Sequence, residues 1–165
     1  MGSVSNPRDL LLELLGQLLF VERRLADGVL RELVEAVHDE ELKGALRHHL
    51  EQTERHAERA EIVFRRLDAA PSSNLSRPFE AGKAEHDDRA PSIKPAALAD
   101  VFHAQTALHT EHWEIAAYTA VLAIADAMGH GDAVADLRES LRDEEEARDA
   151  LQQLVQRLAA DGCAR

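Results

Sequence analysis

Cysteine, aromatic residues and long apolar runs are all scarce in this chain. Its 165 residues contain one cysteine, Cys163, so no intrachain disulfide can form and we expect a reducing, cytoplasmic compartment. Aromatic residues make up only 4% of the chain and β-branched residues are scattered, so no strand is predicted. The longest apolar stretch, residues 10–21, contains a glutamate and is too short to span a bilayer. We therefore expect neither a membrane span nor a signal peptide.

Positive charge is also scarce. Lysine and arginine total 19 against 31 aspartates and glutamates, and the net charge is -12 with histidine neutral. Nucleic acids and anionic membrane surfaces attract clusters of basic residues, so neither is an expected partner. The length suits one domain with a single sizeable core, and we treat residues 1–165 as that domain.

Apolar residues recur at helical spacing in four long segments, which are residues 7–38, 40–69, 95–128 and 132–160. The first segment opens with Asn6 and Pro7, a favourable N-cap followed by a favourable first-turn residue. Gly129 and Gly131 end the third segment, and Asp132 is the expected N-cap of the fourth. The sequence therefore predicts an all-α protein.

The connections between these segments predict the topology. Almost nothing separates the first segment from the second, or the third from the fourth, so each pair is expected to form an antiparallel hairpin. Residues 70–94 join the two hairpins and are long enough to cross a helix of about 45 Å. Two hairpins joined by a long crossover make a ferritin-like four-helix bundle. The alternative, an interaction module of two separate hairpins, would need fewer apolar positions than these segments carry.

Polar residues interrupt the apolar stripe near the middle of every segment, and antiparallel hairpins would bring these interruptions to nearly one height. Buried carboxylates need a metal, a cationic partner or a proton, because an unpaired buried charge is very costly. Carboxylates combined with imidazoles suit a pair of iron or manganese ions. The candidate metal ligands are Glu22, His49, His56, Glu111, Glu114 and Glu144.

Other polar residues near these positions are not expected to bind metal. The chain's single Glu-x-x-His sequence, Glu35 to His38, lies at the end of the first segment and off its apolar stripe, so we predict that it is exposed. His109 and His112 are predicted to lie on the helix surface or at an interface. Tyr118 is predicted to be a packing residue.

Four short motifs surround the candidate ligands. They are Val21-Glu22-Arg23-Arg24-Leu25, His49-Leu50-Glu51-Gln52-Thr53, Glu111-His112-Trp113-Glu114-Ile115-Ala116-Ala117-Tyr118, and Leu141 followed by Asp143-Glu144-Glu145. Together they resemble the bacterial YciE/YciF stress-protein family, and the similarity spans residues 10–154. The resemblance implies a fold like that of rubrerythrins and ferritins, a dimer, and a carboxylate-bridged dinuclear iron site. It carries over as ligands Glu22, Glu111, Glu114 and Glu144, with His49 nearby.

The chain departs from that family in three places. Gln52 replaces an acidic residue, and Arg148 stands where the family has an aspartate, with Asp149 next to it. The crossover is shorter, and we expect it to lack most of the family's short extra helix. Arg148 could neutralise Glu144 in place of a metal. Alternatively, His56 could enter as a replacement ligand, or Asp149 could turn inward.

These observations predict a ferritin-like, stress-related protein with a dinuclear iron or manganese site, which oxidises iron(II) or handles oxygen or peroxide. The alternative is a metal-free helical bundle with a structural or interaction role, whose carboxylates are neutralised by Arg148. Leu12, Leu15 and Leu19 exceed what a four-helix core needs, and they indicate a homodimer interface.

Overall fold

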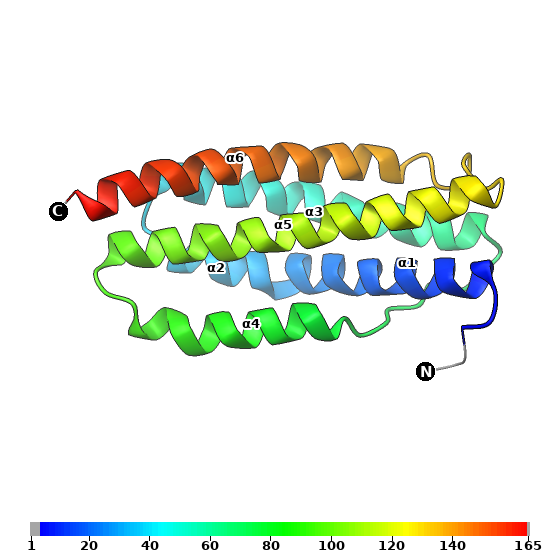
Figure 1. Cartoon of the computed structure of the whole chain (residues 1–165), viewed down its shortest axis with the longest axis horizontal. Helices are drawn as coiled ribbons and strands as arrows, with labels where there is room; N and C mark the ends of the chain where they lie inside the picture. Colours follow the sequence, from blue (N-terminus) through cyan, green and yellow to red (C-terminus); the bar gives the residue numbers. More distant parts are fainter. Residues whose placement is uncertain (1–3, 165) are drawn as a thin grey trace.

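The computed structural model of the chain describes residues 4–164, apart from the side chain of Cys163, and these residues form an all-helical bundle without strands (Figure 1). The helical elements in chain order are α1 (Pro7–Arg24), the π-helical turn η1 (Leu25–Val29), α2 (Leu30–Ala36), α3 (Glu40–Arg66), α4 (Arg77–Arg89), η2 (Ala90–Ser92), α5 (Ala96–Ala127) and α6 (Leu137–Cys163). No helix within residues 4–164 is long and apolar enough to cross a membrane.

The predicted ferritin-like topology is confirmed. The run from α1 to α2 packs against α3 as one antiparallel hairpin, and α5 packs against α6 as the other (Figure 1). Between the hairpins, α1 contacts α5 and α3 contacts α6. The apolar core is divided into two clusters, one around Leu18, Phe64 and Val121 and the other around Leu25 and Leu46. Polar residues occupy the level between these two clusters.

The first hairpin begins as predicted but contains a π turn that was not expected. The side chain of Asn6 accepts a hydrogen bond of 3.0 Å from the backbone N–H of Asp9, and Pro7 opens α1. The helix then runs to Ala36, two residues short of the predicted end, and η1 interrupts it three residues after Glu22. A π turn adds one residue to a helix and often lies near a functional site. Hydrophobic periodicity over a long window averages out such a single insertion.

The predicted N-cap of the last helix, Asp132, is wrong. Helix α6 begins at Leu137, and residues 131–136 form turns instead. Their backbone hydrogen bonds span three residues, as from the N–H of Leu137 to the carbonyl of Val134 at 3.0 Å. This tighter winding follows Gly129, whose φ of 76° ends α5. Because Val134 and Leu137 are both fully buried, the turns close this end of the core.

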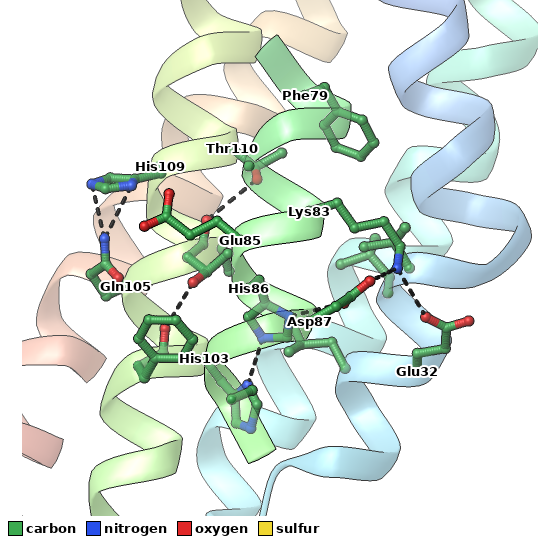
Figure 2. A pocket seen from close by; sticks show the side chains of 18 of the residues that line it. Glu32, Phe79, Lys83, Glu85, His86, Asp87, His103, Gln105, His109 and Thr110 are labelled. Atoms are coloured by element: carbon green, nitrogen blue, oxygen red, sulfur yellow. Dashed lines mark hydrogen bonds and ion pairs between the residues drawn. The ribbon is translucent and has the colours of Figure 1, made fainter. Parts of the chain in front are cut away.

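The expectation that the crossover lacks most of an extra helix is also wrong. Residues 77–89 form the 13-residue helix α4, which lies beside α2 and α5 (Figure 1). None of its residues is buried. Polar contacts hold it against the bundle, such as the 2.9 Å ion pair between Arg24 and Glu80. Figure 2 shows part of this helix from close by. A helix without a fully buried face gives little apolar periodicity, which explains why the sequence did not predict it.

The leucines that suggested a dimer interface lie largely inside the bundle. Leu15 and Leu19 are fully buried, and Leu12 is partly buried against the same core cluster. The crossover covers this side of α1, because the N–H of Asn74 donates to the carbonyl of Gly16 at 2.9 Å. The surplus of leucines thus reflects a crossover packed on α1, and the homodimer stays a prediction of the family resemblance.

Candidate metal centre

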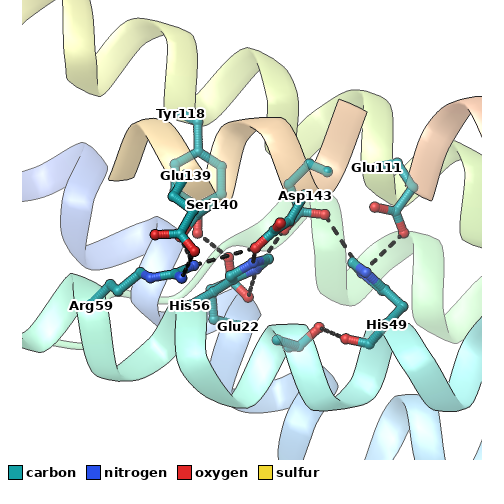
Figure 3. Close-up of polar contacts among 11 residues, drawn as sticks. Glu22, His49, His56, Arg59, Glu111, Tyr118, Glu139, Ser140 and Asp143 are labelled. Atoms are coloured by element: carbon teal, nitrogen blue, oxygen red, sulfur yellow. Dashed lines mark hydrogen bonds and ion pairs between the residues drawn. The ribbon is translucent and has the colours of Figure 1, made fainter. Parts of the chain in front are cut away.

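The six predicted ligands meet at one level in the middle of the bundle. Helix α1 supplies one of them, α3 two, α5 two and α6 one, and each residue is at most 4% exposed. Figure 3 labels four of the six. The full set is Glu22, His49, His56, Glu111, Glu114 and Glu144. The helical spacing of these residues turns them inward, and the antiparallel hairpins align their heights.

The donor atoms form two groups that share one glutamate. One group comprises His49, Glu111, Glu114 and Glu144, the other comprises Glu22, His56 and Glu144, and within each group the donor atoms lie within 4.8 Å of one another. Oε2 of Glu144 is 3.5 Å from Nε2 of His49, and its Oε1 is 2.8 Å from Nδ1 of His56. The two oxygens of Glu144 therefore face the two histidines, as expected of a carboxylate that bridges two ions.

Many atoms in this cluster are buried without a hydrogen-bond partner. They include Oε2 of Glu22, Nε2 of His49, Nδ1 of His56, Oε2 of Glu111, and both carboxylate oxygens of Glu114 and of Glu144. Outside the cluster, the described residues have only two such side-chain atoms, on Ser76 and Arg157. Buried polar atoms are normally paired, so a concentration of unpaired donors fits a cation that coordinates them. The oxygen and imidazole donors fit a pair of iron or manganese ions.

Burial and mutual repulsion favour protons on several of these carboxylates. Burial, followed by the charge of Glu144, raises the pKa of Glu111 well above its usual range. Burial, followed by the charge of Glu22, does the same for the pKa of Glu114. A cation bound among these residues would displace such protons, because it stabilises the ionised form.

His56 and Glu144 behave as an ion pair within the cluster. Burial opposes the charge on His56, but the charge of Glu22 and contact with Glu144 raise its pKa to about 10. Burial also opposes the charge on Glu144, but the close polar contact with His56, 2.8 Å away, and the charge of His49 lower its pKa to about 2. A protonated His56 thus supplies positive charge at the place where one cation would bind.

Residues around the cluster hold its members in position. Tyr118 donates a hydrogen bond to Oε1 of Glu22 (Figure 3). Oδ2 of Asp143 lies 3.0 Å from Nε2 of His56, and Arg59 in turn lies 3.3 Å from the same oxygen. A carboxylate at one ring nitrogen fixes the orientation of a histidine, so Nδ1 of His56 is directed to Glu22 and Glu144.

These positioning roles were not predicted from the sequence. Tyr118 was predicted only to pack, yet it lies four residues after Glu114 and therefore on the same face of α5. Asp143 belongs to a run of acidic residues, which is typical of a solvated face. The signal that could have found Asp143 is the need of a buried histidine, His56, for a partner at its second nitrogen.

The structure also shows where the residues that depart from the family pattern lie. Arg148 lies 2.7 Å from Asp149, and no ion pair joins it to Glu144 among the described residues. Asp149 is exposed and does not turn inward. Gln52 is buried on α3 between the two histidines, and of the alternatives raised by the sequence, His56 is the residue that joins the cluster.

The residues that were predicted to lie outside the site do so. Glu35 and His38 are exposed at the end of the first hairpin, and His109 and His112 are exposed on α5. The six predicted ligands are thus brought together without these alternatives, and metal binding by the six stays a prediction.

Comparisons with known proteins place the chain in a family. The family described as "Domain of unknown function (DUF892)" matches residues 6–164. YcfI from Rhodopseudomonas palustris, described provisionally as a structural protein, is 29% identical; the match has a TM-score of 0.87 and covers 91% of this chain and 95% of YcfI. The stress protein YciF of E. coli is 23% identical; its TM-score is 0.85, with 95% of this chain and 99% of YciF covered. No curated protein matches. These similarities confirm the resemblance seen in the sequence, and the chain belongs to the DUF892 family.

Proposed function

We propose that this chain is a stress-related, ferritin-like protein that binds two iron ions, or manganese ions, in the middle of its bundle and oxidises bound iron(II). The observation that carries the proposal is the pair of buried donor groups that share Glu144 and lack hydrogen-bond partners. The similarity to the stress protein YciF supports a role in the stress response. Carboxylate donors favour the higher oxidation state of iron, which suits iron(II) as a substrate for oxidation.

In this proposal the cluster divides into two halves. Glu22 and His56 hold one ion; His49, Glu111 and Glu114 hold the other; and Glu144 lies between them. With peroxide as the oxidant, two iron(II) ions give up one electron each, and with two protons they reduce one hydrogen peroxide molecule to two water molecules. Oxygen is the alternative oxidant. The chain contributes by keeping the donors buried and fixed in position.

The compartment and assembly are also part of the proposal. The single cysteine of the chain favours the cytoplasm. The family resemblance favours a homodimer. Light scattering on the purified chain tests the dimer directly, and a mass of one chain would reject it.

Anaerobic loading with iron(II) tests the metal site. We expect about two ions per chain by elemental analysis, as the two donor groups imply, and a near-ultraviolet absorption band once oxygen or peroxide is added. A double variant, Glu22→Gln with Glu111→Gln, should lose both while keeping the fold, because glutamine has nearly the same shape. The matched control, Glu145→Gln, changes an exposed neighbour and should keep both. Wild-type protein without bound metal and without the band would reject the proposal.

The second candidate is a metal-free structural bundle, which the description of YcfI favours. Arg148 pairs with Asp149 and therefore does not neutralise Glu144. In this candidate, protons on Glu111 and Glu114 would reduce the negative charge of the cluster instead. This candidate predicts that a chelator leaves the melting temperature unchanged and that added manganese(II) has no effect. A clear metal-dependent shift in melting temperature would exclude it.

A further inference from the structure

A cavity of about 580 Å³ lies between α4, α5 and the π turn of the first hairpin (Figure 2). This volume is within the range of small-molecule sites in proteins. Its walls are mainly apolar, with Leu25, Val29 and Leu33 on one side and Ala107 on another. Leu25, Leu33 and Ala107 belong to the second apolar core cluster, so the cavity borders the core of the bundle.

Aromatic side chains are concentrated around this cavity. Phe79, Phe102 and Trp113 line it, so the chain places two of its 4 phenylalanines and its 1 tryptophan there. Aromatic residues make up only 4% of the chain, so three of them around one cavity are a marked local concentration. Aromatic faces bind flat, apolar molecules by stacking and by edge-to-face contact. The walls therefore suit a ligand that contains an aromatic ring.

The charges at the cavity do not suit an anionic ligand. Lys83, the single lysine or arginine among the described residues that line it, pairs with Asp87 at 2.6 Å and with Glu32 at 3.6 Å (Figure 2). Nδ1 of His103 lies 2.9 Å from Nε2 of His86. Burial, followed by the charge of His86, lowers the pKa of His103, which disfavours a positive charge on its ring. Among the described lining residues no lysine or arginine is free to pair with an anion, and the carboxylates of Glu32 and Asp87 are already paired with Lys83. The paired charges and apolar walls therefore favour a neutral ligand.

The position of α4 is consistent with a cover over a binding site. This helix has no buried residue, although Phe79 packs partly against the core. It contacts the bundle through the Arg24–Glu80 and Lys83–Glu32 ion pairs and through His86, whose ring stacks on Phe102 of α5 with ring centroids 5.5 Å apart. These contacts hold α4 over the cavity and leave its space of about 580 Å³ unfilled.

The inner end of the cavity reaches the candidate metal centre. Glu111 lines the cavity, and its Oε1 lies 3.4 Å from Nε2 of His49 in the cluster. The π turn contributes Leu25 and Val29 to the wall, so the irregular part of the first hairpin borders the same space.

We propose that this cavity binds a neutral aromatic small molecule beneath α4, with one end against Glu111. That the molecule lies next to bound metal rests on the proposed function, whereas binding in the cavity does not. The test therefore uses metal-free, full-length protein, so that failure of one proposal can be told from failure of the other.

Two fluorescent probes that share the same rings and differ by one sulfonate group test the ligand class. N-phenylnaphthylamine is neutral, and anilinonaphthalene sulfonate carries the same rings with one negative charge. Energy transfer from Trp113, the chain's only tryptophan, reports binding near the cavity. We expect one neutral probe per chain, bound at least about tenfold more tightly than the sulfonate. No saturable transfer, or equal binding of the two probes, would overturn the proposal.

A pair of threonine variants tests the location. The hydroxyls of Thr106 and Thr119 each donate to a carbonyl four residues earlier on α5, but only Thr106 lines the cavity. Thr106→Phe should fill the space and weaken probe binding at least about tenfold, whereas Thr119→Phe should leave it unchanged. Equal affinities in the two variants would place the probe elsewhere and overturn the proposal.

A second variant covers the case in which Thr106→Phe does not fold, as judged by circular dichroism. Phe79→Ala removes one aromatic wall from α4, a helix without buried residues. This substitution should weaken binding of the neutral probe several-fold, with little change in the melting temperature of the protein. An unchanged affinity in folded Phe79→Ala protein would also overturn the proposal.

Discussion

Replacing Glu114 by glutamine should stabilise the metal-free protein and abolish its stabilisation by metal. Glu114 is fully buried, and neither of its carboxylate oxygens has a hydrogen-bond partner. Burial, followed by the charges of Glu22 and Glu144, raises its pKa well above the usual range. Ionised Glu114 therefore opposes folding without metal, because the unfolded chain would solvate the charge. Glutamine keeps the shape and removes that charge.

The pH dependence of stability follows from the direction of this shift. The folded pKa of Glu114 lies above its unfolded value, so its contribution to stability is fully present below about pH 4.3 and is lost as the pH rises through the raised value. Burial raises the pKa of Glu111 in the same way. Metal-free wild-type protein should melt at a lower temperature at about pH 8 than at about pH 5.5, and Glu114→Gln should reduce this difference.

Added metal should reverse the order of the melting temperatures of wild-type protein and Glu114→Gln. A ligand that binds only the folded state adds about 2.7 kcal/mol when present at 100 times its Kd. For a domain of this size, that is roughly 5–11 °C in melting temperature. Wild-type protein should show such a rise with manganese(II), and Glu114→Gln should show little, because both of its ligand oxygens are lost as anionic donors.

Thermal melts followed by circular dichroism, with chelator and with manganese(II), measure both effects. Glu145→Gln is the matched control, since Glu145 is an exposed residue of α6 and should change neither result. The reasoning is refuted if Glu114→Gln melts below wild type in chelator at about pH 8, or if it keeps the full rise with manganese(II).

Four other substitutions test the surroundings of the site and the helical frame. Asp143→Asn should weaken metal binding about 10- to 100-fold in a metal titration, because Asp143 holds the outer nitrogen of His56 at 3.0 Å. Asp39→Ala removes the side-chain cap of α3 and should cost about 1 kcal/mol in urea unfolding. Gly16→Ala should destabilise by about 1–3 kcal/mol, because the new Cβ would lie 2.5 Å from a side-chain nitrogen of the crossover. Gly44→Ala, where the added Cβ meets nothing within 4 Å, should instead stabilise α3 by about 0.5–1 kcal/mol.

The sequence was sufficient to predict the bundle and the inward-facing polar residues of the candidate site, because both depend on periodicity. Apolar residues at helical spacing mark the buried stripe, and Glu22 or Glu144 within such a stripe must point inward with its apolar neighbours. The cap at Asn6 was predictable for a similar reason, since it depends on a few adjacent residues, whereas the predicted cap at Asp132 failed because turns precede α6.

Features that depend on contacts between distant segments were not predictable in the same way. Leu15 and Leu19 looked superfluous until the crossover was seen to cover α1 at Gly16. Asp143 looked like part of a solvated run, because its pairing with His56 joins residues 87 positions apart. The tight turns before α6 likewise depend on where Val134 packs in the core.

The polar layer between the two apolar clusters also has a consequence for how the helices align. All four long helical segments contribute side chains to this layer, and each must meet the others at the same height. Sliding one helix by a single turn, about 5.4 Å, would move its carboxylate among leucines and leave the other donors facing apolar carbon. A uniformly apolar core would tolerate such a slip far better. The buried glutamates thus act as a register mark that selects one alignment of the two hairpins, with or without metal.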